Sequence, residues 1–313
     1  MMPRPLAGLA AVTLLAAVSV STAQDNKAIP GIGPVGPVQK VQGGFTFTEG
    51  PAADRSGNLY FTDVRAQKIH KLGADGTVTV IREQSNGANG LMFNAKGELI
   101  ACEMGSGAVV AYSPDGKERR VLAGEYNGKR FNAPNDLVID KQGGVYFTDP
   151  QFNAPTPLPQ RDRSVYYLAP DGKVTRLFDK DHPAPNGVIL SPDEKSLYVI
   201  PSMTADMMVY QVESPGKVGA GKVFCSLKQP SGRQNTGGDG LAIDTKGNLY
   251  ITSQLGVQVY NPAGEHLGTI SFPEIPANCD FGGPDMKTLY VTARTSLYAV
   301  KMEAQGHVFA SGK

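Results

Sequence analysis

The sequence is poor in the residues that mark several common functional classes. It contains no tryptophan, three cysteines and four histidines, and its 30 lysines and arginines nearly balance 29 aspartates and glutamates. A formal net charge of +1 leaves no basic surplus to hold a nucleic-acid backbone. The chain also lacks a HExxH zinc motif, a GxSxG elbow, a Walker loop and an EF-hand loop. These absences disfavour nucleic acid as a partner and a histidine- or cysteine-based metal site.

Residues 1–23 have the composition of a secretory signal peptide. Arg4 precedes an apolar run at residues 6–20, and Ser21-Thr22-Ala23 supplies the small residues of a cleavage site. The run is short for a membrane span, and no second apolar stretch approaches membrane length. We therefore expect cleavage after Ala23, a secreted, periplasmic protein without membrane association, a flexible segment at 24–37 and one domain at 38–313.

The three cysteines are Cys102, Cys225 and Cys279. An odd number in an oxidising compartment leaves at least one thiol free. Each lies in an apolar or strand-like segment, so we expect three buried thiols, with one disulfide as the alternative. A catalytic cysteine is disfavoured, because no histidine accompanies any of the three in a recognisable motif.

A short β-rich element occurs six times, and the 37 glycines and 23 prolines punctuate it. Successive copies are 40, 46, 52, 52 and 40 residues apart, which is the period of propeller blades. Asp-Gly turns between β-branched and aromatic runs are typical of hairpins. The repeat predicts an all-β fold, a six-bladed β-propeller with four antiparallel strands per blade, closed by pairing of residues 38–47 with the last blade. The anchors of the six copies are Tyr60, Ile100, Tyr146, Tyr198, Tyr250 and Tyr290.

A polar residue stands eleven or twelve positions before every anchor, where the first strand of each blade begins. In a propeller this strand lines the central channel, so the six positions form a ring around the axis. Two carboxylates and four amides, with no lysine or arginine, suit a hard divalent cation such as Ca²⁺. The alternative is turn chemistry around a water-filled channel. The ring residues are Glu49, Asn89, Asn135, Asn186, Asp239 and Asn278.

The longest loops are expected at the end of the channel that carries this ring. They comprise residues 124–134, 150–163, 179–185 and 228–238, whereas the opposite end has mainly tight turns. Long loops over a polar axial site indicate a substrate pocket with a lid. Pro155, Pro157 and Pro159 would stiffen that lid.

Several segments together resemble the gluconolactonase / senescence marker protein (regucalcin) family, which is itself similar to calcium-dependent organophosphatases and paraoxonases. The resemblance covers nearly all of the mature chain and implies a six-bladed propeller with one catalytic divalent ion in its channel. The segments that carry it are FTEGP at 47–51, GKRFNAPND at 128–136, YFTDP at 146–150, PNGV at 185–188, SPDE at 191–194, GDG at 238–240 and NCDFGG at 278–283.

The resemblance also implies roles for ring residues. Metal ligands fall on Glu49, Asn186 and Asp239, with Asn135 as a ligand or a substrate contact. The acid/base or nucleophile role falls on Asp239. We expect one divalent ion, Ca²⁺ first and Mg²⁺, Mn²⁺ or Zn²⁺ as alternatives, which would polarise the carbonyl of a small lactone or ester.

Further residues are candidates for orienting water and substrate. Asn89 and Asn278 belong to the ring, and Arg130 and Asn132 lie in the loop before the third blade. Asp136 is a candidate support for the ligands, with an ordinary solvated or strand-edge position as the equal alternative.

Two departures from the family pattern bear on the substrate. Met104 follows Glu103 where bacterial relatives often have histidine, and Ile200-Pro201-Ser202-Met203 stands where they often have Ala-Asp. We expect Met203, with Met207 and Met208, to make the rim apolar, which makes an apolar lactone or ester plausible. An organophosphate or ester hydrolase and a non-catalytic periplasmic binding propeller remain alternatives, and a monomer or weak dimer is expected.

Overall fold

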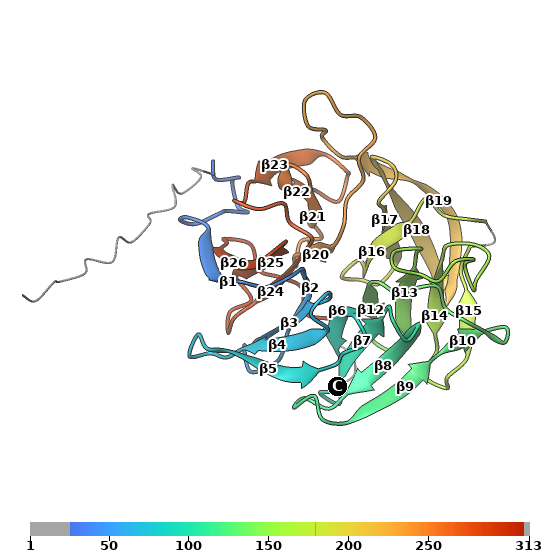
Figure 1. Cartoon of the computed structure of the whole chain (residues 1–313). Helices are drawn as coiled ribbons and strands as arrows, with labels where there is room; N and C mark the ends of the chain where they lie inside the picture. Colours follow the sequence, from blue (N-terminus) through green and yellow to red (C-terminus); the bar gives the residue numbers. More distant parts are fainter. Residues whose placement is uncertain (1–25, 179, 310–313) are drawn as a thin grey trace, which may run out of the picture.

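The computed structural model describes residues 26–178 and 180–309, which form a ring of six antiparallel sheets (Figure 1). Each sheet has four strands, and a two-stranded hairpin, β10 (Glu125–Tyr126) with β11 (Lys129–Arg130), lies outside them. The six-bladed β-propeller that the repeat predicted is therefore confirmed. No described segment forms a helix of the length and hydrophobicity needed to cross a bilayer.

The blades follow one another along the chain. Blade 1 contains β2 (Thr48–Ala53), β3 (Leu59–Asp63), β4 (Lys68–Leu72) and β5 (Val78–Glu83). Blade 2 contains β6 (Ala88–Phe93), β7 (Leu99–Glu103), β8 (Ala108–Tyr112) and β9 (Arg119–Ala123). Blade 3 contains β12 (Leu137–Ile139), β13 (Val145–Asp149), β14 (Ser164–Leu168) and β15 (Val174–Arg176).

The second half of the ring repeats this order. Blade 4 contains β16 (Pro185–Leu190), β17 (Ser196–Pro201), β18 (Asp206–Ser214) and β19 (Lys217–Ser226). Blade 5 contains β20 (Leu241–Ile243), β21 (Leu249–Ser253), β22 (Gly256–Tyr260) and β23 (His266–Ile270). Blade 6 contains β24 (Asn278–Gly282), β25 (Thr288–Ala293), β26 (Ser296–Lys301) and β1 (Gln39–Gly43).

The last blade takes its outer strand from the other end of the chain. Strand β1 pairs antiparallel with β26, so residues near both ends of the sequence lie in one sheet (Figure 1). The expected closure through residues 38–47 is confirmed. The predicted signal peptide at 1–23 lies outside the described residues. The segment at 24–37 is described from residue 26, where Ile29 and Ile32 are buried and the Asn26 side chain bonds the Ser271 backbone at 2.7 and 3.0 Å.

A threonine in the second strand of four blades explains part of the repeated sequence. Each of these threonines is fully buried, and its hydroxyl bonds to a main-chain carbonyl next to the channel. Thr252 Oγ1, for example, donates to the carbonyl oxygens of Gly240 and Ala277 at 2.9 and 2.8 Å, which ties blade 5 to blade 6. The other three threonines are Thr62, Thr148 and Thr292. Thr62 and Thr252 thus join neighbouring blades, whereas Thr148 and Thr292 bond to a carbonyl of their own blade.

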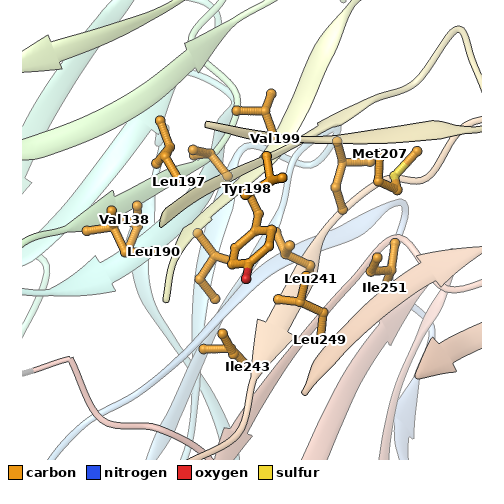
Figure 2. Packing of buried hydrophobic residues seen from close by; sticks show 14 of the residues in the cluster. Val138, Leu190, Leu197, Tyr198, Val199, Met207, Leu241, Ile243, Leu249 and Ile251 are labelled. Carbon is orange, nitrogen blue, oxygen red and sulfur yellow. The ribbon is translucent and has the colours of Figure 1, made fainter. Parts of the chain in front are cut away.

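The hydrophobic core lies between the faces of adjacent blades. Figure 2 shows one such cluster, in which Tyr198 of β17 points among side chains from blades 3, 4 and 5. Val138 comes from β12, Leu197 from β17 and Leu241 from β20. Alternating side chains of a strand face opposite sides of its sheet, so each blade contributes apolar residues to both neighbours.

All three cysteines are free and buried, as the sequence predicted. The Cys102 thiol lies 3.6 Å from the Asp136 carbonyl oxygen. The Cys279 thiol lies 3.4 Å from the Tyr250 carbonyl oxygen. Burial raises the pKa of the Cys225 thiol to about 12. The thiols therefore act as small core groups in the protonated form.

Replacing Leu197 with alanine should destabilise the propeller, because the side chain is fully buried between blades. Large-to-small substitutions at such sites cost about 2–5 kcal/mol. Urea unfolding followed by circular dichroism measures the loss. Val223→Ala, at an exposed position of β19, is the matched control and should cost less than about 1 kcal/mol. Equal losses in the two variants would contradict the packing described for the core.

Candidate functional site

A pocket of about 480 Å³ opens at one end of the channel and contains most of the predicted ring. Five of the six ring residues line it, and these are Glu49, Asn89, Asn135, Asn186 and Asp239. The sixth, Asn278, lines a second cavity of about 420 Å³ that also contacts Asp136 and Asp280. The ring is thus brought together as predicted, with Asn278 on its inner side.

Glycines allow the ring residues to converge. A glycine follows the ring residue in blades 1, 2, 4 and 5. A Cβ on Gly50 would lie 1.9 Å from the Asn89 carbonyl oxygen, and one on Gly240 would lie 2.0 Å from the Asn278 side chain. Neither distance is possible for real atoms, so glycine is required where the inner strands approach the axis.

Asp239 is fixed by a short chain of hydrogen bonds. Asn186 Nδ2 donates to Asp239 Oδ1 at 2.6 Å and to Ser202 Oγ at 2.9 Å. Ser202 Oγ in turn donates to the Gly238 carbonyl oxygen at 3.1 Å. The amide of Asn186 is therefore oriented with its nitrogen toward these partners, and its Oδ1 has no protein donor among the described residues. The sequence pointed to Asn186 and Asp239 but not to Ser202.

Three carboxyl groups lie near the axis, of which Glu49 and Asp136 are buried and Asp239 is partly exposed to the pocket. Burial, and then the Asp239 and Asp136 carboxylates, raise the pKa of Glu49 well above its ordinary value. Burial raises the pKa of Asp239 to about 6, against the lowering effect of the Asn186 hydrogen bond and of Arg294. Burial likewise raises the pKa of Asp136 to about 7. Burial is the largest cause of all three shifts, and a bound cation would favour the ionised forms.

The donor set fits a cation that prefers oxygen. Glu49 and Asp239 offer carboxylates, and Asn135 and Asn186 offer amide oxygens. The Asn135 side chain lines the pocket without a hydrogen-bond partner in the described part of the chain. Within residues 26–178 and 180–309, no group of three histidine, cysteine, aspartate or glutamate side chains could hold a metal. The residues present therefore suit Ca²⁺ or Mg²⁺ with mixed carboxylate, amide and water ligands, and not a zinc site of nitrogen and sulfur.

The structure does not bring three of the four predicted substrate contacts, Arg130, Asn132 and Asn278, to the pocket. Arg130 donates to the carbonyl oxygens of Met104 and Gly105, both at 3.3 Å. Asn132 is fully buried, and its Oδ1 accepts a hydrogen bond from the Gln160 main-chain nitrogen at 2.8 Å. Neither residue lines the pocket. Both side chains instead form hydrogen bonds with main-chain atoms of the surrounding loops.

The apolar wall of the pocket differs from the predicted one. Met207 packs in the core between blades, and Met203 projects into solvent with 56% of its surface exposed. Neither these two nor Met208 lines the pocket. Met104 does line it, with its Sδ 3.6 Å from Asn89 Nδ2. The other apolar lining side chains are Phe47, Val64, Phe152, Ile275, Pro276 and Ala277.

Sequence reasoning missed two arginines at the pocket, Arg65 and Arg294. Each stands in the turn between the second and third strands of its blade, and Met104 occupies the same turn in blade 2. This turn lies at the end of the blade where the ring residue begins the first strand. The position in the repeat was therefore a usable signal for these arginines.

The chain matches known proteins over most of its length. The family described as SMP-30/Gluconolactonase/LRE-like region matches residues 47–295. A gluconolactonase of Zymomonas mobilis is 32% identical over 296 residues, or 86% of this chain and 82% of that protein. Lactonase drp35 of Staphylococcus haemolyticus is 30% identical over 233 residues, or 72% and 69%. The solved structure of a gluconolactonase from Xanthomonas campestris has a TM-score of 0.78 at 30% identity and covers 85% of this chain and 89% of its own.

The buried carboxyl groups predict how the metal-free protein responds to pH. Their folded-state pKa values lie above the ordinary value, so the folded protein binds more protons than the unfolded chain between about pH 4 and 7. The free energy of unfolding should therefore fall as pH rises through this range. Urea unfolding in the presence of a chelator measures it.

The variant Asp239→Asn should flatten that profile, because one of the titrating groups is removed. Glu118→Gln, at an exposed carboxylate, is the matched control and should leave the slope unchanged. A metal-free protein whose stability does not depend on pH between 4 and 7 would contradict the charge arrangement described for the ring.

Proposed function

Because the chain belongs to the SMP-30/gluconolactonase/LRE-like family, we propose that this hydrolase opens lactone rings with the help of one divalent cation. The observation that carries the proposal is the ring of oxygen donors at the base of a pocket. Glu49, Asn135, Asn186 and Asp239 would hold the ion, with Ca²⁺ as the best match to mixed carboxylate and amide oxygens. The reaction consumes a lactone and water and yields the open hydroxy acid.

The bound cation would supply Lewis acidity toward the lactone carbonyl and stabilise the negative charge that develops on its oxygen. The residues of the chain do the rest. Asp239 removes a proton from the attacking water, as a carboxylate that lines the pocket beside the other proposed ligands. Asn186 holds Asp239 Oδ1 at 2.6 Å and thereby fixes the direction of proton transfer.

The pocket has the size of a small cyclic substrate. Its volume of about 480 Å³ falls within the range of ligand sites. Asn89 also lines the pocket, where its amide would orient the substrate. Phe152 and Asn153 come from the loop at 150–163, in the position proposed for a lid. Burial of the substrate beneath them excludes bulk water from the reacting bond.

Removing the metal should abolish turnover. We expect dialysis against a chelator to eliminate hydrolysis of a lactone panel, and Ca²⁺ to restore it more fully than Mg²⁺, Mn²⁺ or Zn²⁺. Asp239→Asn should keep the fold and lower kcat by about 10²–10⁴, the usual contribution of a general base. Initial rates measured above the uncatalysed background give both results.

Glu118→Gln, which alters an exposed carboxylate, is the matched control for the activity assay. Full activity after complete metal removal would overturn the metal dependence. Full activity of Asp239→Asn would overturn the role of that residue. Organophosphate substrates in the same panel distinguish a lactonase from a phosphotriesterase, and a protein that turns over neither class would be a binding propeller.

We further propose that the protein acts in the periplasm after removal of residues 1–23. The apolar run and the small residues before Gln24 support this. Intact-mass measurement of the protein from a periplasmic fraction should give a chain that begins at Gln24. A mature protein that retains its first residues in the cytoplasmic fraction would overturn the proposal.

A further inference from the structure

Two arginines flank one aromatic side chain at the mouth of the pocket. The guanidinium carbon of Arg65 lies 5.2 Å from the centroid of the Phe47 ring, and that of Arg294 lies 5.7 Å from it. All three side chains line the pocket. The arginines come from the blades on either side of the ring closure, blade 1 and blade 6. Stacking on an aromatic ring limits the freedom of a guanidinium and leaves its N–H groups available.

Main-chain hydrogen bonds fix both turns to the segment that carries Phe47. The Val64 nitrogen donates to the Phe47 carbonyl oxygen at 2.9 Å, and the Thr48 nitrogen donates to the Arg294 carbonyl oxygen at 2.8 Å. The next residue after Thr48 is Glu49 of the ring. The arginines are thus held at a set position relative to the proposed metal ligand, and they do not sit on a free loop.

Both guanidinium groups lack an ion pair within the described chain, although the charge of Arg294 lowers the pKa of Asp239. None of the described carboxylates forms an ion pair with Arg65 or Arg294. Asp63, next to the first turn, accepts hydrogen bonds from the main-chain nitrogens of residues 46, 47 and 66. Glu274, next to the second turn, accepts hydrogen bonds from residues 295, 296 and 298. These two carboxylates, which stand next to the turns in the sequence, are therefore already engaged.

We propose that Arg65 and Arg294 form a subsite for an anionic group of the substrate, so that the preferred lactones carry a carboxylate or a phosphate. The inference rests on the proposed function, because it assigns the substrate class of the same pocket. With a divalent cation on the ring, the charges of Glu49 and Asp239 are balanced, and the two arginines remain as a net positive charge at the mouth. Guanidinium groups bind carboxylate and phosphate through paired, charge-assisted hydrogen bonds.

Kinetics on three lactones test the subsite. D-Glucono-1,5-lactone is neutral, D-glucaro-1,4-lactone carries a carboxylate and 6-phospho-D-glucono-1,5-lactone carries a phosphate. The wild-type protein with Ca²⁺ should show a kcat/KM at least about tenfold higher for one of the anionic lactones than for the neutral one, which corresponds to one charge-assisted hydrogen bond. The better of the two anionic substrates identifies which group the subsite takes.

Variants assign this preference to the arginines. Arg65→Gln and Arg294→Asn each should lower kcat/KM for the preferred anionic lactone about tenfold, mainly through KM. Asparagine is chosen at position 294 because the residue has a φ of 50°, which asparagine tolerates. Arg65→Gln should change kcat/KM for the neutral lactone less than about twofold. Arg294→Asn also removes a charge that lowers the pKa of Asp239, so its effect is taken from the ratio of kcat/KM for the anionic and neutral lactones. Arg55→Gln removes an exposed arginine at the opposite end of blade 1 and is the matched control.

Two outcomes overturn the proposal. One is a double variant, Arg65→Gln with Arg294→Asn, that keeps the wild-type preference for anionic lactones. The other is an equal loss for neutral and anionic substrates. If the wild-type protein hydrolyses no lactone at all, the proposed function fails, and titration calorimetry with D-glucarate then decides the subsite alone. Binding by the wild-type protein that the double variant lacks supports the subsite, and equal binding by both overturns it.

Discussion

The placement of two carboxylates close together on a common axis is the constraint on which the rest of this molecule depends. Glu49 and Asp239 lie among the inner ends of six strands, with Asp136 beside them, and burial raises the pKa of each. An arrangement of this kind opposes folding unless protons or a cation neutralise it. A scaffold that only had to hold six sheets together would gain nothing from such residues. Their presence at the axis therefore supports the active site proposed there.

The fold holds these polar side chains on rigid inner strands. Glycines at positions such as 50 and 240 remove the Cβ atoms that would keep the inner strands apart. Buried threonines such as Thr252 join neighbouring blades through their carbonyl oxygens. Apolar side chains between the blades supply most of the stabilising burial (Figure 2). Polar atoms at the axis are therefore positioned by backbone, and they need little adjustment when a ligand arrives.

The six-bladed fold could be predicted from the sequence because the same sequence element occurs six times and forms the same structure each time. The spacing of Tyr60 and its counterparts was enough to place the strands, and the polar residue before each was enough to place the ring. Side-chain direction in loops was not predictable in the same way. Asn132 carried a motif of the family, yet its amide bonds the loop at Gln160 and is fully buried. Met207 was expected at the rim and packs in the core, because strand alternation turned it inward.

The pocket is complete only when the ring of blades closes, because it takes residues from both the first and the last blade. Blade 6 is complete only when β1, near one end of the chain, pairs with β26, near the other (Figure 1). Arg65 and Arg294 stand on opposite sides of this seam, and Thr48 bonds across it to Arg294. The pocket mouth is thus assembled by the pairing of greatest sequence separation, which is the slowest kind of contact to form. A nascent chain must therefore carry the sequence of all six blades before the proposed arginine subsite can form, and that subsite forms in the same event that closes the ring.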